Sequence, residues 1–338
     1  MYTKTLVRTC ALAIVAIGAV SVANAQTVTE LTFSSAAPVG SPWQKQYERF
    51  AADVAAETKG SVKINIFYGS QLGAENDVIA QVARGRVDMG GFTLGSIGLQ
   101  VPEVLATSLP MYYDSEAQRG CVLDKYAFEP VRAALAKKNL SLLTWMEVGS
   151  QQIAAKKPLL TPADVKGLKI GVTINKMTAG LWEAVGAVPV ATAVPEAASG
   201  LSTGLVDAYP TMAAFYVPSG LNKVAPVWTI VNVQMAPGAM IIGKAALAKM
   251  TPEQTAGLLR AAAKTPASQI RAEILAAESG MIAKHKEGGG TVAQANDAQL
   301  GEWKTLLAPY WSKVVKELGP AASEIFAKVE EGKKSCGK

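Results

Sequence analysis

Residues 62–91 read VKINIFYGSQLGAENDVIAQVARGRVDMGG, and this stretch decides the fold. Apolar and polar residues alternate over 62–66, which is the pattern of a half-buried strand. A helix is expected over 74–84 and a second strand over 87–91. A strand, a helix and a strand in this order indicate a right-handed crossover between parallel strands. We therefore expect an α/β fold with a largely parallel sheet.

The same order of elements continues on both sides of this stretch. Upstream, a strand over 31–35 precedes a helix that Ser41 caps and Pro42 begins. Downstream, strands are expected over 169–172 and 188–191, with a helix over 176–185 between them. From residue 251 onward the chain is mainly helical. Pro266 should kink or break the first of these helices, and two more are expected over 297–318 and 321–331.

A short internal repeat supports two similar halves. Residues 84–88 read RGRVD and residues 203–207 read TGLVD, each at the junction of an expected helix and strand. Gly85 and Gly204 can adopt the left-handed conformation that ends a helix. The repeat is short enough to arise by coincidence.

The first 25 residues have the pattern of a secretory signal peptide. Lys4 and Arg8 precede an apolar run, and residues 23–25 (ANA) place small residues at a cleavage site after Ala25. The alternative is a membrane anchor, but the run is shorter than the roughly 20 residues that cross a bilayer. We expect a periplasmic protein. Its remaining length, about 310 residues, exceeds what one core usually supports and indicates two domains.

Charge and cysteine content narrow the possible partners. The net charge is +6, but the basic residues are scattered among acidic ones, so nucleic acid is not an expected partner. Cys121 and Cys336 remain after the leader is removed. In an oxidising compartment they are a disulfide candidate, and two separate thiols are the alternative.

Motifs for catalysis or metal binding do not stand out. The chain has one histidine, His285, in a polar stretch that is typical of a solvated helix end. A single histidine and two distant cysteines predict neither a metal cluster nor a cofactor site. The glycine-rich residues 90–96 lack the lysine of a phosphate loop and favour close approach of backbone to a ligand. We expect a binding protein and not an enzyme.

An ordered series of short segments resembles the solute-binding proteins of tripartite ATP-independent periplasmic (TRAP) transporters, over roughly residues 29–330. The segments are 40–43 (GSPW), 69–73 (GSQLG), 85–89 (GRVDM), 109–110 (LP), 164–170 (DVKGLKI), 186–189 (GAVP) and 204–208 (GLVDA).

The resemblance implies a two-lobed α/β receptor with mixed sheets and flanking helices. Lobe one would hold residues 26–149 and about 238–280, and lobe two residues 150–237 and about 281–338. A hinge of strands would join the lobes, and a long helix near 251–286 would cross both. The receptor would close on a solute and deliver it to a small and a large membrane subunit driven by an ion gradient. A monomer is expected, because no stretch of the sequence indicates a dimer interface.

The residues expected to face the cleft depart from the family. The family usually has a carboxylate-gripping arginine where this chain has Gly171, and Gln151 replaces a second arginine found in some members. The expected ligand-binding residues are uncharged: Ala36, Thr93, Gln151, Gly171, Thr173, Ile174, Val194, Tyr209 and Thr211.

An arginine-free cleft leaves the charge of the solute open, because burying an unpaired carboxylate is costly. The solute is neutral or apolar, or backbone N–H groups and Gln151 meet its carboxylate, or a metal ion supplies the charge. A cation from elsewhere, Lys176 or Arg119, is a further option. Two other receptor classes compete with TRAP transport: a same-fold receptor for a membrane sensor kinase, and a tricarboxylate-type binding protein.

Overall fold

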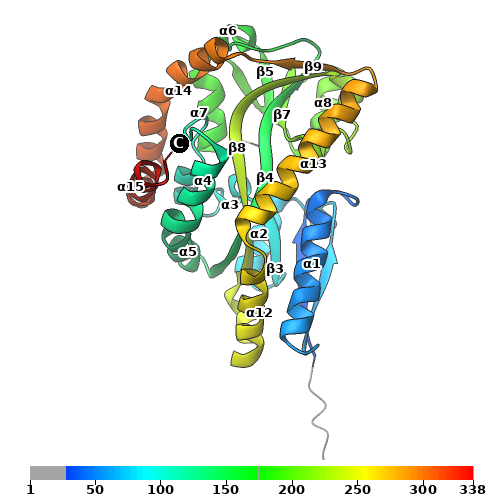
Figure 1. Ribbon diagram of the computed structural model, residues 1–338, viewed down its shortest axis with the longest axis vertical. Coiled ribbons are helices and arrows are strands. Elements are labelled where there is room, and N and C mark those ends of the chain that lie inside the picture. The colour runs from blue at the N-terminus through cyan, green and yellow to red at the C-terminus, as the bar shows by residue number, and fades with distance from the viewer. Residues whose placement is uncertain (1–27, 174, 338) are drawn as a thin grey trace, which may run out of the picture.

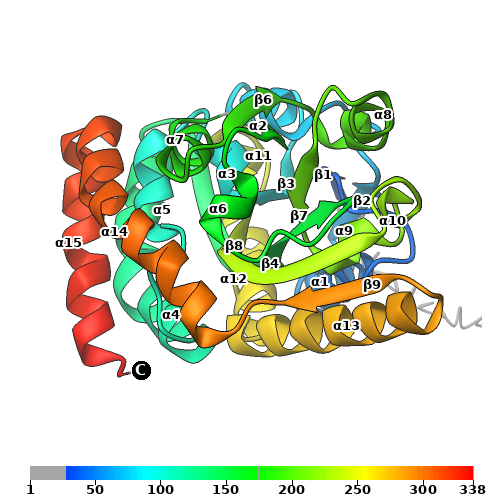
Figure 2. The ribbon, with the colours of Figure 1, turned by 90° about the horizontal axis from the view of Figure 1, so that it is seen from above.

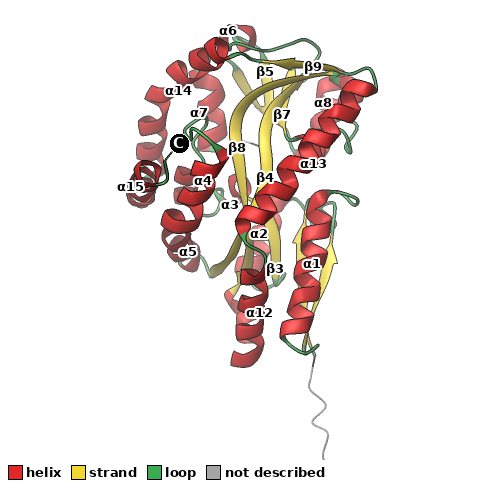
Figure 3. Cartoon of the chain, in the orientation of Figure 1, coloured by secondary structure: helices red, strands yellow, loops and turns green. Residues whose placement is uncertain are grey.

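The computed structural model describes residues 28–173 and 175–337, and these form one mixed β-sheet flanked by helices (Figures 1 and 3). The strand order is β2-β1-β3-β8-β4-β7-β5-β6, and β9 pairs with β8. The strands are β1 (Thr29–Ser35), β2 (Val62–Phe67), β3 (Met89–Thr93), β4 (Leu140–Ala155), β5 (Lys169–Val172), β6 (Val188–Ala191), β7 (Ala208–Thr211), β8 (Val227–Gly243) and β9 (Thr291–Gln294).

The helices cover both faces of this sheet. They are α1 (Pro42–Glu57), α2 (Glu75–Ala83), α3 (Leu94–Ile97), η1 (Pro102–Thr107), α4 (Glu116–Val122), η2 (Leu123–Ala127), α5 (Phe128–Ala136), α6 (Pro162–Val165), α7 (Lys176–Ala184), η3 (Val194–Glu196), α8 (Ala197–Thr203), α9 (Ala213–Tyr216), α10 (Leu221–Val224), α11 (Lys244–Ala248), α12 (Pro252–Lys264), α13 (Ala267–Glu287), α14 (Asp297–Leu318) and α15 (Pro320–Ser335).

Two long antiparallel strands, β4 and β8, join the halves of the molecule (Figure 1). They pair from Leu140 opposite Gly243 to Ala155 opposite Val227. At one end β8 pairs with β3, and at the other β4 pairs with β7. The register shifts between Glu147 and Gly149, in the middle of β4. This confirms the expected two-lobed α/β class with strands at the hinge.

The internal repeat corresponds to equivalent hydrogen bonds in the two halves. Asp88 accepts a bond from the backbone N–H of Thr32 on β1, and Asp207 accepts one from Lys169 on β5, each over 2.8 Å. Each aspartate therefore ties the end of a helix–strand junction to a neighbouring strand. The segments RGRVD and TGLVD therefore occupy equivalent positions in the two halves and make equivalent hydrogen bonds.

Pro266 divides the helical region after residue 251, as its missing N–H and fixed φ require. α12 ends at Lys264, and α13 begins after Pro266, which occupies the N-cap position. The expected helix over 251–286 is therefore two helices. α13 alone lies across β4 and extends to α9 and β9 (Figure 1).

The last two helices pack side by side along one edge of the molecule (Figure 2). α14 contacts α7, and α15 contacts η1, η2 and α4. Cys336, at the end of α15, is disulfide-bonded to Cys121 of α4, with 5.9 Å between the Cα atoms. This pairing was one of two alternatives open from sequence, and the structure confirms it.

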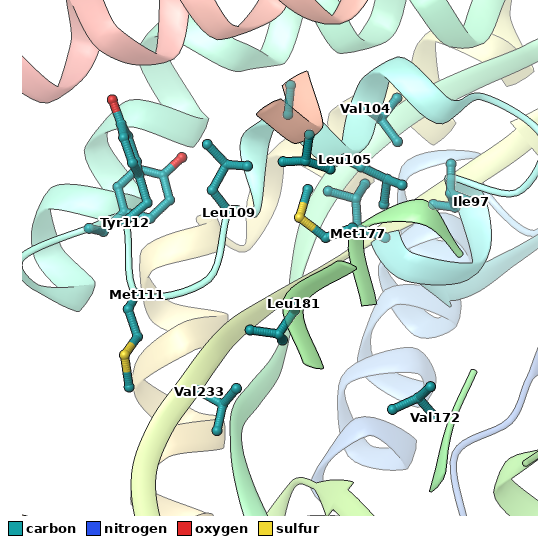
Figure 4. Close-up of a cluster of buried hydrophobic side chains, with 14 of the residues drawn as sticks. Ile97, Val104, Leu105, Leu109, Met111, Tyr112, Val172, Met177, Leu181 and Val233 are labelled. Carbon is teal, nitrogen blue, oxygen red and sulfur yellow. The ribbon is translucent and has the colours of Figure 1, made fainter. Parts of the chain in front are cut away.

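The largest hydrophobic cluster lies between the sheet and the helices on the α7–α14 side. Figure 4 shows part of it, where Leu105 of η1, Met177 and Leu181 of α7, and Val233 of β8 gather. Helix α7 therefore packs into the core and also contacts the neighbouring strands β5 and β6.

His285 is buried, so the expectation of a solvated helix end was wrong. It is 6% exposed, and its Nε2 lies 3.1 Å from the carbonyl oxygen of Pro226 and 3.4 Å from the hydroxyl of Tyr216. The chain after α13 folds back over the imidazole, and a Cβ on Gly290 would lie 2.0 Å from the ring. The polar neighbours in sequence gave no sign of this return.

The described part of the chain contains no helix long and apolar enough to cross a membrane. The expected signal peptide over residues 1–25 lies outside the described residues. The division of the chain into lobes by residue number stays a prediction.

Candidate functional site

A cavity of about 700 Å³ opens between the two halves of the molecule. Ends of parallel strands, and the loops that follow them, supply most of its walls, which is where α/β proteins commonly bind ligands. One half contributes the loop before α2 and the β3–α3 junction, and the other contributes the ends of β5, β6 and β7. β4 and β8 run along the side that the halves share.

Seven of the nine predicted site residues line this cavity. They are Ala36, Thr93, Gln151, Thr173, Val194, Tyr209 and Thr211. Gly171 is buried and lies behind the cavity wall, and Ile174 is outside the described residues. The sequence motifs therefore located the cavity, although the ligand-binding role of these residues stays a prediction.

Tyr209 occupies the space in front of Gly171. A Cβ built on Gly171 would lie 2.8 Å from Cδ2 of Tyr209 and 3.2 Å from the hydroxyl oxygen of Thr192. Any side chain at position 171 would thus collide with the tyrosine ring. Tyr209, which is only 4% exposed, reaches the cavity in place of the side chain that Gly171 lacks.

Three polar side chains of the cavity wall, one on β4 and two on β7, are free to bind a solute. Among the described residues, the amide of Gln151 and the hydroxyls of Tyr209 and Thr211 have no hydrogen-bonding partner within the protein. Their neighbour Gln152 differs, because its amide binds the backbone N–H groups of Val231 and Asn232. All three free groups are uncharged.

Glu75, at the start of α2, contributes a half-buried carboxyl to the cavity wall. It accepts hydrogen bonds from the hydroxyl of Thr93 over 2.6 Å and from the backbone N–H of Thr93 over 3.2 Å. Burial raises the pKa of Glu75, and these hydrogen bonds oppose the rise only in part. The carboxyl thus holds the β3–α3 junction in place at the cavity wall.

The two cations that could have served the cleft are engaged elsewhere. Arg119 is fully buried and forms ion pairs with Glu116, over 2.5 Å, and with Glu147. Lys176 donates from Nζ to the carbonyl oxygen of Glu317 over 2.9 Å. Neither lines the cavity, and the lining residues that the structure describes include no lysine or arginine.

Asn175 connects the two halves at the mouth of the cavity. It is the N-cap of α7, where its side chain accepts from the N–H of Thr178 over 2.9 Å. Its Nδ2 also donates to the carbonyl oxygen of Gly95 on α3 over 3.3 Å. The structure is therefore closed at this edge.

Several wall residues were missed by sequence reasoning. They are Glu75, Asn175, Phe215 and Gln234. None of them belongs to the quoted family segments. For Glu75 a signal existed, because it lies two residues after the GSQLG segment and at the start of an expected helix. For Phe215 the signal was its position after the GLVDA segment, although an aromatic residue there is more often part of the core. Gln234 is placed by β8, and the local sequence carries no cue for it.

Comparison with known proteins identifies the family. Residues 33–318 match the family model described as "Bacterial extracellular solute-binding protein, family 7". The chain belongs to this family. A solute-binding protein of Chromohalobacter salexigens is 28% identical over 283 residues, which is 83% of each chain.

Solved structures agree. A TRAP periplasmic solute-binding protein from Chromohalobacter salexigens, with bound D-glucuronate, matches with a TM-score of 0.83 and 25% identity, covering 89% of this chain and 99% of that chain. One from Roseobacter denitrificans, with bound β-D-glucuronate, matches with a TM-score of 0.79 and 27% identity, covering 88% and 99%.

The family assignment confirms the resemblance to TRAP receptors. Members of this family are solute receptors that bind small molecules outside the cytoplasm and work with TRAP membrane subunits. The protein is thus a receptor that captures a small organic solute for transport.

Proposed function

We propose that the solute is held in the 700 Å³ cavity between the lobes, in contact with Gln151, Tyr209 and Thr211. The observation that carries this proposal is that these three polar side chains face the cavity without partners in the described protein. Polar groups in that state favour a ligand that supplies the missing hydrogen bonds.

Closure of the lobes then presents the loaded receptor to the small and large membrane subunits. A ligand shifts the hinge toward the closed form only if it contacts both halves, and the cavity walls come from both. The receptor works in the periplasm as a monomer, after loss of residues 1–25, and it releases its solute unchanged.

Thermal-shift assays on residues 26–338 test this proposal. The protein is unfolded and refolded with its disulfide intact to remove carried-over solute. It is then screened against sugar acids, other organic acids, neutral sugars and neutral aromatic compounds. A compound at 100 times its dissociation constant should add about 2.7 kcal/mol of stability.

A matched pair of variants places the binding site. Gln151→Ala should weaken binding of the best compound about tenfold or more, because it removes a hydrogen bond inside the cavity. Gln100→Ala, at an exposed residue that does not line the cavity, should leave affinity unchanged. Equal affinities for both variants would contradict the proposed site, and chemical conversion of the compound would contradict a receptor role.

A further inference from the structure

We propose that the solute of this receptor is uncharged at the point where it meets the cleft, and that the pairing of Tyr209 with Gly171 selects against organic anions. This inference rests on the proposed function of the cavity and names the class of its ligand. The uncharged class comprises hydroxylated, amide-bearing or aromatic compounds that fill the cavity without a carboxylate.

The first argument is the charge of the wall. The described residues that line the cavity supply two carboxyl groups, Glu75 inside and Glu196 at the exposed rim, and no cationic side chain. Arg119 and Lys176, the cations the sequence suggested, are held by other partners. A carboxylate that leaves water for such a site meets no cationic side chain among the described lining residues.

The free-energy cost of moving a carboxylate into this wall exceeds what hydrogen bonds from neutral groups recover. Burying a carboxylate without a cation costs several orders of magnitude in affinity, because the lost hydration is replaced only by dipoles. The dipoles available are the amide of Gln151 and the hydroxyls of Tyr209 and Thr211. The same groups can donate to and accept from the hydroxyls or the amide of a neutral solute, which has no charge to desolvate.

The second argument is that the wall has no room for a cation at position 171. Cδ2 of Tyr209 lies 2.8 Å from where a Cβ of residue 171 would stand, so the ring and a longer side chain exclude each other. The ring of Tyr209 belongs to the cavity wall, and Trp182 and Phe215 add two further aromatic side chains to that wall. Tyr209 thus converts a possible anion site into a surface for neutral groups.

Matched probes of similar size and different charge test the class. Benzoate, benzamide and benzylamine form one set, and D-glucuronate with D-glucuronamide forms another. Binding is measured by calorimetry at pH 8 in EDTA, and again with calcium. Benzamide or glucuronamide should bind at least tenfold more tightly than the matching acid. Tighter binding of either acid, with or without calcium, or of the amine, would overturn the inference and leave the cavity's receptor role intact.

A designed change of specificity gives a second, independent readout. Gly171→Arg with Tyr209→Ala places a guanidinium where the ring was, and Gly171→Ala with Tyr209→Ala opens the same space without a charge. The arginine variant should bind the acids at least tenfold more tightly than the wild type, and the alanine variant should not. Equal acid binding by all three proteins would overturn the selecting role of this pair. If no compound of the whole thermal-shift screen stabilised the wild type, the proposed function of the cavity would fail as well.

Discussion

The side-chain amide of Asn175 and the backbone carbonyl of Gly95 meet across the mouth of the cavity, with 3.3 Å between Nδ2 and O. The same side chain caps α7 through its oxygen. One residue thus supports a helix and connects the two halves, and the two tasks use different atoms.

Substitutions of Asn175 should separate these tasks. Asn175→Ala should lower the free energy of unfolding by about 1 kcal/mol, because the helix loses its cap, and should also weaken solute binding. Asn175→Asp keeps the capping oxygen but loses the donor to Gly95. It should therefore preserve stability and still weaken binding. Chemical denaturation and calorimetry measure both, and an unchanged affinity in both variants would contradict a role in closure.

Stability should fall with rising pH because of Glu278 on α13. This side chain accepts hydrogen bonds from the N–H groups of Ser150 and Ala213, over 3.3 Å and 3.2 Å. Burial first, and then the nearby carboxyls of Glu147 and Glu116, raise the pKa of Glu278 to about 8. The folded protein then holds a proton that the unfolded chain has lost. Stability is full below about pH 4.5 and decreases, by up to a few kcal/mol, as pH rises towards 8.

A variant isolates this contribution. Glu278→Gln should flatten the decrease in unfolding free energy between pH 5 and pH 8, although the amide loses one of the two backbone bonds and lowers stability at pH 5 by about 1 kcal/mol. Glu302→Gln, at an exposed position of α14, is the control and should retain the wild-type slope. An identical slope in all three proteins would show that Glu278 ionises normally.

The Cys121–Cys336 disulfide should contribute about 2–5 kcal/mol, because it closes a separation of 215 residues in the unfolded chain. Cys121→Ser with Cys336→Ser should lower the denaturation midpoint, and dithiothreitol should do the same to the wild type but not to the variant. If reductant left the wild-type midpoint unchanged, the crosslink would carry no stability.

The two aspartates of the internal repeat should differ in importance because their burial differs. Asp88 is 5% exposed and also pairs with Lys249 over 2.7 Å, whereas Asp207 is exposed. Asp88→Ala should cost about 2–3 kcal/mol and Asp207→Ala about 1 kcal/mol, since a buried N–H left without an acceptor costs more than one that water can reach. Equal losses in denaturation experiments would contradict this explanation.

Much of the fold was predictable because local patterns carry it. Alternating apolar residues located β2, the N-cap Ser41 with Pro42 located α1, and Pro266 located the break between α12 and α13. These signals depend on neighbours within a few residues. These elements can therefore be predicted correctly without any knowledge of the tertiary structure.

The site was predictable only in part. Motif order placed Thr93, Gln151, Tyr209 and Thr211 at the cavity, but it also assigned Gly171 to the surface of the cleft. Gly171 lies behind Tyr209 because β5 and β7 are neighbours in the sheet, 38 residues apart in sequence from Lys169 to Asp207. His285 was misjudged for a similar reason, since a returning segment buries it.

By itself, the sequence determined the class of fold, the order of its elements, the family and the absence of a cation at position 171. Periodicity and capping residues are short-range signals, and motif order needs only the sequence of segments along the chain, not their contacts. Only the tertiary structure decided that Arg119 and Lys176 have other partners and that Tyr209 fills the space before Gly171. Charge pairing and steric exclusion act between side chains that touch, and contacts between distant segments exist only once β4 and β8 have brought the two halves together.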